Sequence, residues 1–262
     1  MFSKTEVFVS NVLNLKFIFI TFSYLESQLF EIMPEIIDLS QEIYEGMPVF
    51  KDLPQVKMEI HNSHEEWEGI KNPSKRTPAV HKLELGEHTG THVDAINHMA
   101  QQYEGQSIDK MPLSMFYTEG ICLDFSHKKL GELIEPDEVE SICKNSNLTI
   151  NKGDTVLIHT DHYRKHFNTD NWGNGPGISA ETARWLGENK ISAFGVETMS
   201  PGVRKVSNKE VHQICGELSF THYENMINLH QLIGKGRFRF IAFPLKIRGG
   251  TGSPVRAVAV FE

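Results

Sequence analysis

The pattern of apolar positions along the chain predicts short strands that alternate with a smaller number of helices. Segments rich in Val, Ile, Leu or Phe and bounded by Gly, Pro or Asp predict strands at residues 80–85, 120–125, 155–159, 192–197, 237–244 and 255–261. Pro136 predicts the first turn of a helix over residues 137–144, and Ser179 predicts the N-cap of a helix over residues 180–189. Strands mixed with helices indicate the α/β class.

Nothing in this pattern divides the chain into several domains. No internal repeat or low-complexity linker is present, and 262 residues with 39% hydrophobic content can bury one sizeable core. We therefore expect one domain over residues 33–262. Residues 1–32 are expected to be an extension or the result of a misassigned start. A secretory leader is disfavoured because no small-residue cleavage pattern follows the apolar stretch, which is also too short to span a bilayer.

The most informative polar pattern lies in residues 86–99. Donors of metal-ligating type follow one another at spacings of four, two and four residues: His88, His92, Asp94 and His98. Side chains alternate along a strand, so in an extended segment all of these would project to one side, whereas in a helix Asp94 would point away. Gly90 and the β-branched residues around it also disfavour helix. We therefore expect a strand end that leads into a loop.

This spacing indicates a metal site, because imidazole and carboxylate are the donors that zinc and manganese favour. A catalytic site needs about three such ligands and an open position for water. Leu83 and Leu85 occupy odd positions just before the run, whereas the donors occupy even ones. Either Gly86 marks a bulge that changes the face, or the donors point away from the face that carries the leucines. Both alternatives leave the donor face free for a cleft.

Composition and charge narrow the class of partner. A formal net charge of -8 argues against a nucleic-acid surface, which usually needs a basic stripe, and favours a small-molecule substrate or a protein partner. The three cysteines form no CxxC pattern, so neither a disulfide framework nor a thiolate metal site is indicated, and a reducing cytoplasm is expected. The Gly-rich stretches lack nucleotide-binding spacing, and no GxSxG elbow supports a nucleophilic serine.

The run over residues 88–98 resembles the HxGTHxDxPxH signature of the cyclase-type metal-dependent hydrolases, the family that includes bacterial kynurenine formamidase and isatin hydrolase. The resemblance covers most of residues 33–262, with further similar stretches at 37–40, 44–48, 107–113, 243–246 and 252–257. It implies a swivelling β/β/α fold with a mainly parallel sheet, a second antiparallel sheet and a helical layer. It also implies a homodimer or homotetramer. From the net charge and the short apolar stretch, no nucleic-acid or membrane partner is expected.

The resemblance implies two roles for the polar residues of the run over residues 88–98, metal ligand and proton carrier. His88, His92 and Asp94 match the metal ligands, and Asp94 matches an aspartate that bridges two ions in members that bind a pair. His98 matches the histidine assigned to proton transfer. Zinc is the first candidate for the metal, manganese is the alternative, and one or two ions are expected.

Two more distant residues match the family's second metal site. His212 and Glu224 stand twelve residues apart, as do the corresponding histidine and glutamate. Without the family pattern, His212 would be interpreted as a polar residue on a helix and Glu224 as a solvated carboxylate. His222 is left out because its spacing matches nothing. Four other histidines are likewise treated as non-ligands: His81, His159, His162 and His166.

The chain departs from the family at three positions. Ile96 stands where the family usually has a proline that fixes one backbone torsion between Asp94 and His98. Glu197 replaces an aspartate at a strand end, and Asp161 replaces a glycine after the preceding strand. The last two changes lie where a strand leaves the core, so they could reshape the substrate pocket without touching the metal.

The leading hypothesis is hydrolysis of a C–N bond in a small carbonyl substrate by a metal-activated water, with an aryl formamide such as N-formylkynurenine as first candidate. A hydrolase of cyclic amides such as isatin, or of lactones, is the alternative enzyme. A metal- or ligand-binding protein without turnover is the alternative outside enzymes, motivated by the three departures. Trp67, Trp172 and Phe167 could line a pocket for a planar aromatic substrate, or could pack in the core or in a lid.

Overall fold

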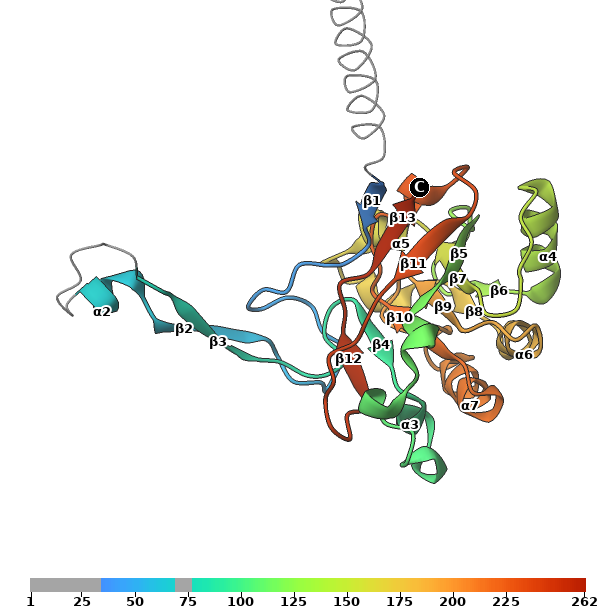
Figure 1. The fold of residues 1–262 in the computed structure, drawn as a ribbon. Coiled ribbons are helices and arrows are strands. Elements are labelled where there is room, and N and C mark those ends of the chain that lie inside the picture. The colour runs from blue at the N-terminus through green and yellow to red at the C-terminus, as the bar shows by residue number, and fades with distance from the viewer. Residues whose placement is uncertain (1–33, 69–76) are drawn as a thin grey trace, which may run out of the picture. The chain divides into compact units, whose positions relative to one another are not determined.

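One mixed β-sheet forms the centre of the part of the chain that the structure describes, residues 34–68 and 77–262 of a computed structural model (Figure 1). Its nine strands lie in the order β1-β13-β11-β5-β7-β9-β10-β4-β12. Their bounds are β1 Glu35–Asp38, β4 His92–Asp94, β5 Tyr117–Asp124, β7 Thr155–His159, β9 Ala193–Val196, β10 Thr221–Glu224, β11 Phe238–Ile241, β12 Gly252–Pro254 and β13 Val258–Phe261. Residues 36–260 form one compact unit.

The centre of this sheet is parallel and both its flanks are antiparallel. Strands β5, β7, β9 and β10 pair in parallel, whereas β11 and β13 on one side and β4 and β12 on the other pair antiparallel. All residues of β7 and β9 are buried, as is typical of parallel strands covered on both faces. The α/β class with mixed sheets and a helical layer is confirmed. The parallel and antiparallel parts, expected as two sheets, belong to one sheet.

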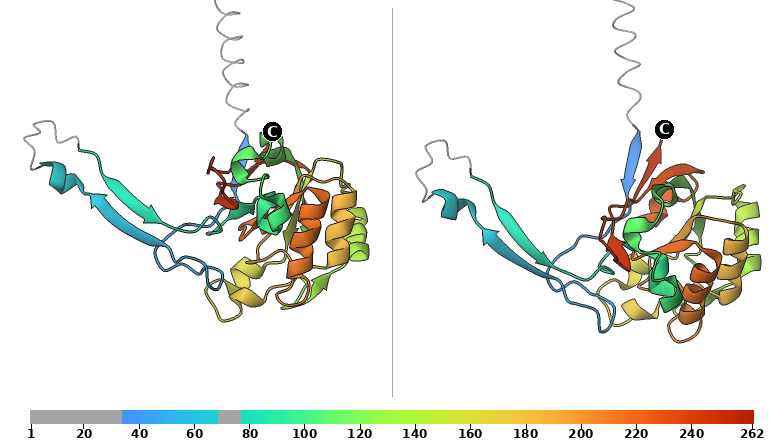
Figure 2. Two further views of the ribbon diagram at one scale, coloured as in Figure 1. Left: turned by 90° about the horizontal axis from the view of Figure 1, so that it is seen from below. Right: turned by 60° about the horizontal axis from the view of Figure 1, so that its bottom comes forward.

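Three helices cover one face of the sheet: α4 (Pro136–Asn145), α6 (Ala180–Glu188) and α7 (Asn208–Leu218) (Figures 1 and 2). Apolar side chains from the helices and from β5, β7 and β9 form one buried cluster, for example Leu186, Ile121 and Phe194. Each fully buried side chain of this size contributes about 1.5–3 kcal/mol relative to an exposed one. The shorter helices are α2 (His64–Glu68), α3 (Ile96–Met99) and α5 (His162–His166), with 3-10 turns at Gln101–Tyr103, Ile108–Lys110, Leu113–Phe116, Trp172–Asn174 and Leu229–Leu232.

The predicted helix starts are confirmed. Helix α4 begins at Pro136 within a capping box, and the Ser179 side chain accepts a hydrogen bond from the Thr182 backbone N–H at the start of α6. All six predicted strands are present, but the last two are shorter than expected. The predicted strand over residues 237–244 ends at Ile241, before Pro244, whose ring nitrogen cannot donate to a neighbouring strand.

The strand before the histidine run does not belong to the central sheet. Strand β3 (Val80–Glu84) pairs antiparallel with β2 (Lys57–Asn62) in a separate two-stranded sheet, and all its residues are exposed. A second small sheet pairs β6 (Leu133–Ile134) with β8 (Gly177–Ile178). Leu83 is 53% exposed, so the odd positions of this segment are not a core face. Neither a bulge at Gly86 nor a leucine face is needed to explain where the donors point.

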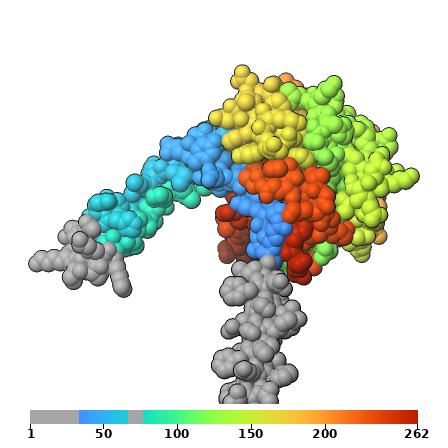
Figure 3. All heavy atoms as spheres, turned by 90° about the horizontal axis from the view of Figure 1, so that it is seen from above, coloured from blue at the N-terminus to red at the C-terminus, as the bar shows by residue number. Residues whose placement is uncertain are grey.

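The segment after β1 is hydrogen-bonded to the segment after β10. Both lie on the face drawn in Figure 3, where the segment after β1 is blue and the segment after β10 is orange. The Ile227 N–H donates to the Leu39 carbonyl at 3.0 Å, and Ser40 forms a β-bridge with Met226. Within the described residues no helix is both long and apolar enough to cross a bilayer. The expected extension, residues 1–32, and the side chain of Trp67 lie outside the described part of the chain.

Candidate metal centre

The candidate site is built on the antiparallel pair of strands β4 and β10. In their register Glu224 lies opposite His92, and the same register continued by one residue places His222 opposite Asp94. Because side chains alternate along a strand, these four project from one face of the pair. All four are almost inaccessible to solvent. Two short strands thus place two carboxylates and two imidazoles side by side inside the protein.

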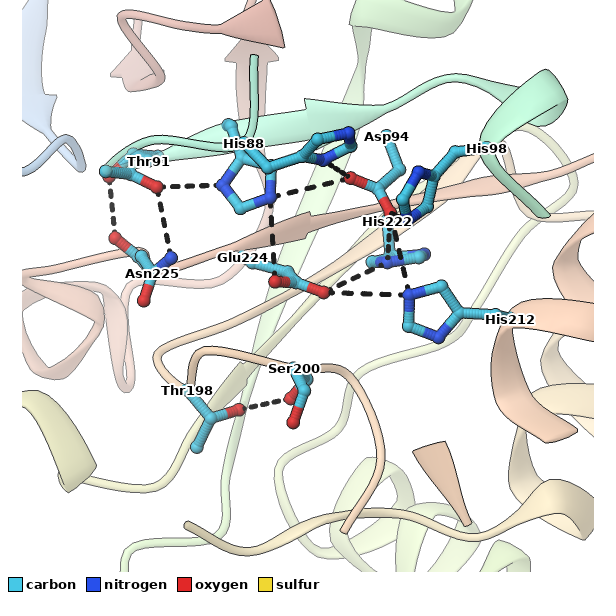
Figure 4. Close-up of polar contacts among 12 residues, drawn as sticks. His88, Thr91, Asp94, His98, Thr198, Ser200, His212, His222, Glu224 and Asn225 are labelled. Carbon is cyan, nitrogen blue, oxygen red and sulfur yellow. Dashed lines mark hydrogen bonds and ion pairs between the residues drawn. The ribbon is translucent and has the colours of Figure 1, made fainter. Parts of the chain in front are cut away.

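The expectation of one extended segment for the histidine run is correct only for its middle part. Strand β4 holds His92 and Asp94, whereas His88 lies in the turn before it and His98 on the one-turn helix α3. Gly90 turns the chain before the strand with a φ of +60°, which glycine adopts without steric cost. The side chains still converge on Asp94, as Figure 4 shows.

Two imidazoles are oriented by backbone carbonyls. His92 donates its Nδ1–H to the Gly90 carbonyl at 2.8 Å, and its Nε2 lies 3.5 Å from Asp94 Oδ1. His212 donates its Nδ1–H to the Asn208 carbonyl at 2.7 Å, and its Nε2 lies 3.6 Å from Asp94 Oδ2. A carbonyl can only accept, so in both neutral rings Nε2 carries the lone pair. This arrangement is typical of metal-binding histidines.

His88 is oriented in the opposite sense, with Nδ1 toward the site. Its Nδ1 lies 2.8 Å from Asp94 Oδ1, and its Nε2 lies 3.1 Å from the Thr251 hydroxyl. The Thr251 hydroxyl donates to Glu87 Oε2 at 2.7 Å, so its oxygen accepts from His88 Nε2–H. The nitrogen that faces Asp94 is therefore the one available to a metal ion. Sequence reasoning found His88 but missed Thr251 and Glu87.

His98 differs from the other imidazoles because its side chain is 37% exposed. Its Nε2 lies 3.6 Å from Asp94 Oδ2, and its ring centroid lies 4.3 Å from that of His88. Burial lowers the pKa of His98 below its ordinary value, and the Asp94 carboxylate offsets this only in part. A partly exposed, neutral imidazole next to the carboxylate can exchange protons with solvent.

The structure also brings in His222, which the sequence argument left out. Its Nε2 lies 3.2 Å from Asp94 Oδ2 and 3.3 Å from Glu224 Oε1. The signal that could have found it is its alternation with Glu224 along one strand, which repeats the spacing of His92 and Asp94. The other excluded histidines lie outside the groups of potential metal donors found in the described residues: His81, His159, His162 and His166.

The electrostatics of the cluster suit a cation. Burial alone would raise the pKa of Asp94, but the surrounding imidazoles, that of His222 first, hold it well below its ordinary value. Burial alone would lower the pKa of His222, but the carboxylates of Asp94 and Glu224 raise it well above its ordinary value. One donor atom from each residue in two overlapping groups lies within 4.8 Å of the others: Asp94, His212, His222 and Glu224; and His88, Asp94 and His98. Nitrogen and oxygen donors of this kind fit a divalent metal ion.

A cavity of about 270 Å³ opens beside these donors. Apolar side chains of Phe50, Leu53 and Met199 line it, together with polar residues of the same loops. Trp172 and Phe167 do not line it, and the side chain of Trp67 lies outside the described residues. Trp172 is buried, and its ring stacks on His162 at 5.1 Å, whereas Phe167 packs edge-on against Trp172 at 5.3 Å. Both rings pack in their own cluster beside α5, so of the two alternatives stated for them, packing inside the protein holds and pocket lining does not.

Two of the residues that depart from the family pattern, Asp161 and Glu197, lie close together in the structure. Asp161 has a φ of +59°, a left-handed conformation that favours glycine and that aspartate tolerates better than most residues. The residues on either side of it, Thr160 and His162, donate backbone N–H groups to the buried Glu197 Oε2 at 2.7 and 3.2 Å. The third departure, Ile96, is the first residue of α3, a position at which proline is well tolerated.

Sequence comparisons match the chain to one family model and to two kinds of hydrolase. A sequence model of the Cyclase family matches residues 37–203. The kynurenine formamidase of Salinibacter ruber is 25% identical over 224 residues, which cover 85% of this chain and 96% of that enzyme. The isatin hydrolase of Roseibium aggregatum is 27% identical over 192 residues, which cover 67% of this chain and 72% of that enzyme.

Solved structures of an isatin hydrolase and of a potential metal-dependent hydrolase share this fold. Isatin hydrolase A from Ralstonia solanacearum aligns with a TM-score of 0.77 at 25% identity, over 92% of this chain and 97% of that chain. A structure described as a potential metal-dependent hydrolase with cyclase activity aligns with a TM-score of 0.67 at 23% identity, over 88% of this chain and 99% of that chain. At its lower identity, the second match bears on the fold alone.

Proposed function

The chain belongs to the cyclase family of metal-dependent hydrolases, and we propose that it hydrolyses a carbon–nitrogen bond in a small carbonyl substrate. The observation that carries this proposal is the Asp94 carboxylate, which is buried beneath the imidazole nitrogens of His88, His92 and His212. A buried carboxylate among imidazoles whose outer nitrogens are already hydrogen-bonded is what a catalytic metal requires.

The nitrogen and oxygen atoms that face the centre of the site indicate which residues would hold the metal. His88 Nδ1, His92 Nε2 and Asp94 Oδ1 would hold one ion. Asp94 Oδ2, His212 Nε2 and Glu224 would hold a second. When bound, a divalent ion lowers the pKa of water from its bulk value toward ~7 and polarises a carbonyl oxygen. We propose zinc as that ion, with manganese as the alternative.

His98 is the proposed proton carrier. Its exposed ring stands beside Asp94 and His88, at the edge of the cluster nearest to solvent. A neutral imidazole can accept the proton of the attacking water and then return it to the leaving nitrogen. The lowered pKa of His98 keeps its ring neutral, and thus able to act as a base, near neutral pH.

The cavity supports a small, partly apolar substrate. Its volume of about 270 Å³ is at the small end of ligand pockets, and Phe50 contributes an aromatic side chain to its lining. The relatives act on N-formylkynurenine-type and isatin-type compounds according to their names, and both compound classes join an aromatic ring to a C–N bond at a carbonyl. We therefore propose an aryl formamide first and a cyclic amide or lactone second.

A panel of substrates with and without a chelator tests this proposal. N-formylkynurenine, isatin and simple lactones are offered to the purified protein, and product formation is followed by absorbance. We expect turnover of an aryl formamide that is lost on chelation and restored by zinc. Turnover of isatin alone would show that the substrate is a cyclic amide and not an aryl formamide. Bound metal without turnover on any substrate would favour a binding protein.

We also propose a cellular compartment and an oligomeric state for the enzyme. The three cysteines Cys122, Cys143 and Cys215 are free thiols, which supports a reducing compartment such as the cytoplasm. Self-association into a homodimer or homotetramer is proposed from the family alone, and light scattering on the purified protein tests it.

A further inference from the structure

We propose that His222 is an additional ligand of the second metal ion, which two imidazoles and two carboxylates would then hold. The proposal extends the proposed function by one residue of this chain. The complete ligand set of the second ion would be Asp94, His212, His222 and Glu224.

The position of the His222 ring carries the inference. Its Nε2 lies 3.2 Å from Asp94 Oδ2 and 3.3 Å from Glu224 Oε1, which are the carboxylate oxygens that also face His212. The rings of His212 and His222 lie 4.8 Å apart and almost perpendicular to each other, at 81°. Both imidazoles thus approach the same two oxygens from different directions, around a common point (Figure 4).

The burial of His222 makes this position unusual. The residue is fully inaccessible to solvent, and within the described residues neither ring nitrogen makes a hydrogen bond of good geometry, although Nε2 faces the two carboxylates. Buried polar groups without a partner are rare in folded proteins because desolvation is costly. A metal ion between Nε2 and the two carboxylates would supply the missing partner.

The surroundings of His222 hold the ring in place. It stands on β10, in register with Phe194 of β9, and the two ring centroids lie 5.5 Å apart. The buried thiol of Cys215, on α7, lies beside the imidazole. A ring packed between a strand neighbour and α7 has little freedom to turn away, so its Nε2 stays directed at the carboxylates.

A second imidazole would change which ion this position prefers. Imidazole suits zinc, cobalt and nickel, whereas sites made only of carboxylates and water suit magnesium, calcium and manganese. The second position of this chain should therefore hold zinc or cobalt more tightly than a position with His212 as its single imidazole.

Cobalt titration of three variants tests the proposal. Co²⁺ is added to metal-free protein, and both binding and the visible spectrum of the bound ion are recorded. In His222→Gln the amide nitrogen can still donate to the carboxylates, whereas the imidazole is lost; His222→Leu removes both. The matched control is His159→Gln, because His159 is a buried histidine beside a carboxylate, Glu197, on another strand.

We expect two Co²⁺ per wild-type chain. In both His222 variants the second ion should bind at least about 10-fold more weakly and with an altered spectrum, whereas His159→Gln should match the wild type. Wild-type affinity and spectrum in His222→Gln would show that His222 only positions Asp94 by a hydrogen bond and would overturn the proposal. Binding of a single ion to the wild type would overturn it as well.

A measurement on the wild type guards against variants that do not fold. In the proton NMR spectrum of the cobalt protein, each bound imidazole gives strongly shifted ring signals. We expect one imidazole more than His88, His92 and His212 supply, and the absence of this extra set would contradict the proposal. The cobalt experiments do not depend on turnover, so loss of the hydrolase activity and loss of the His222 ligand are separate outcomes.

Discussion

At the scale of single residues, the imidazoles of the site differ in how they are held. Backbone carbonyls fix His92 and His212, and the Thr251 hydroxyl fixes His88, so each presents a chosen nitrogen to Asp94. His98 lies at the exposed edge of the cluster and is not fixed in this way in the contacts described above. This contrast supports metal binding by the fixed rings and proton transfer by the exposed one.

The division of roles predicts different outcomes for two substitutions. His98→Ala should lower kcat by about 10²-fold or more, the range of general acid–base catalysis, while the metal content stays at the wild-type level. Asp94→Asn should lose metal and activity together, because Asp94 faces every imidazole of the cluster. Metal analysis and steady-state kinetics check both. Equal loss of metal in both variants would make His98 a ligand.

Local spacing alone predicts only the residues that lie close together along the chain, whereas His212 and Glu224 follow only from the family resemblance. The spacing of His88, His92 and Asp94 is visible in one short segment, and the family resemblance it indicates is confirmed. His222 reaches the same place only through the pairing of β10 with β4. Strand pairing between distant segments cannot be read from local spacing, and so His222 was missed.

At the scale of elements, β12 packs beside β4 and leaves no room next to His88. A Cβ added at Gly252 would lie 2.6 Å from His88 Cε1 and 3.0 Å from the Val93 carbonyl oxygen. Gly252→Ala should therefore displace the His88 ring and weaken metal binding by about 10-fold or more. The matched control is Gly105→Ala, because a Cβ at Gly105 meets nothing within 4 Å. Chelator competition measures both, and equal affinities would refute this role of β12.

Helix starts can be predicted from sequence and strand partners cannot, because the signals for a helix start are local. Ser179 accepts a hydrogen bond from Thr182, three residues away, whatever the rest of the fold. Strand β3 shows the opposite case. Its apolar content and the glycine after it predict a strand correctly, but among the described residues the segment pairs only with β2 in a small sheet, where Leu83 stays exposed.

At the scale of the whole molecule, the site joins segments from several parts of the chain, and metal binding should therefore stabilise the fold. A ligand that binds only the native state stabilises it by about 2.7 kcal/mol at a free concentration of 100 times Kd. We expect zinc to raise the Tm of the wild type and chelation to lower it. Asp94→Asn serves as the control, since its Tm should not respond. An equal response in this variant would place the stabilising metal elsewhere.

The central claim is that hydrolysis depends on metal held around Asp94. The most direct measurement is the activity of chelator-stripped protein on its best substrate during a zinc titration, with bound metal determined at each step. Activity should be absent without metal and should rise in proportion to metal occupancy, until the sites of each chain are filled. Full activity in protein that contains no bound divalent metal would contradict it.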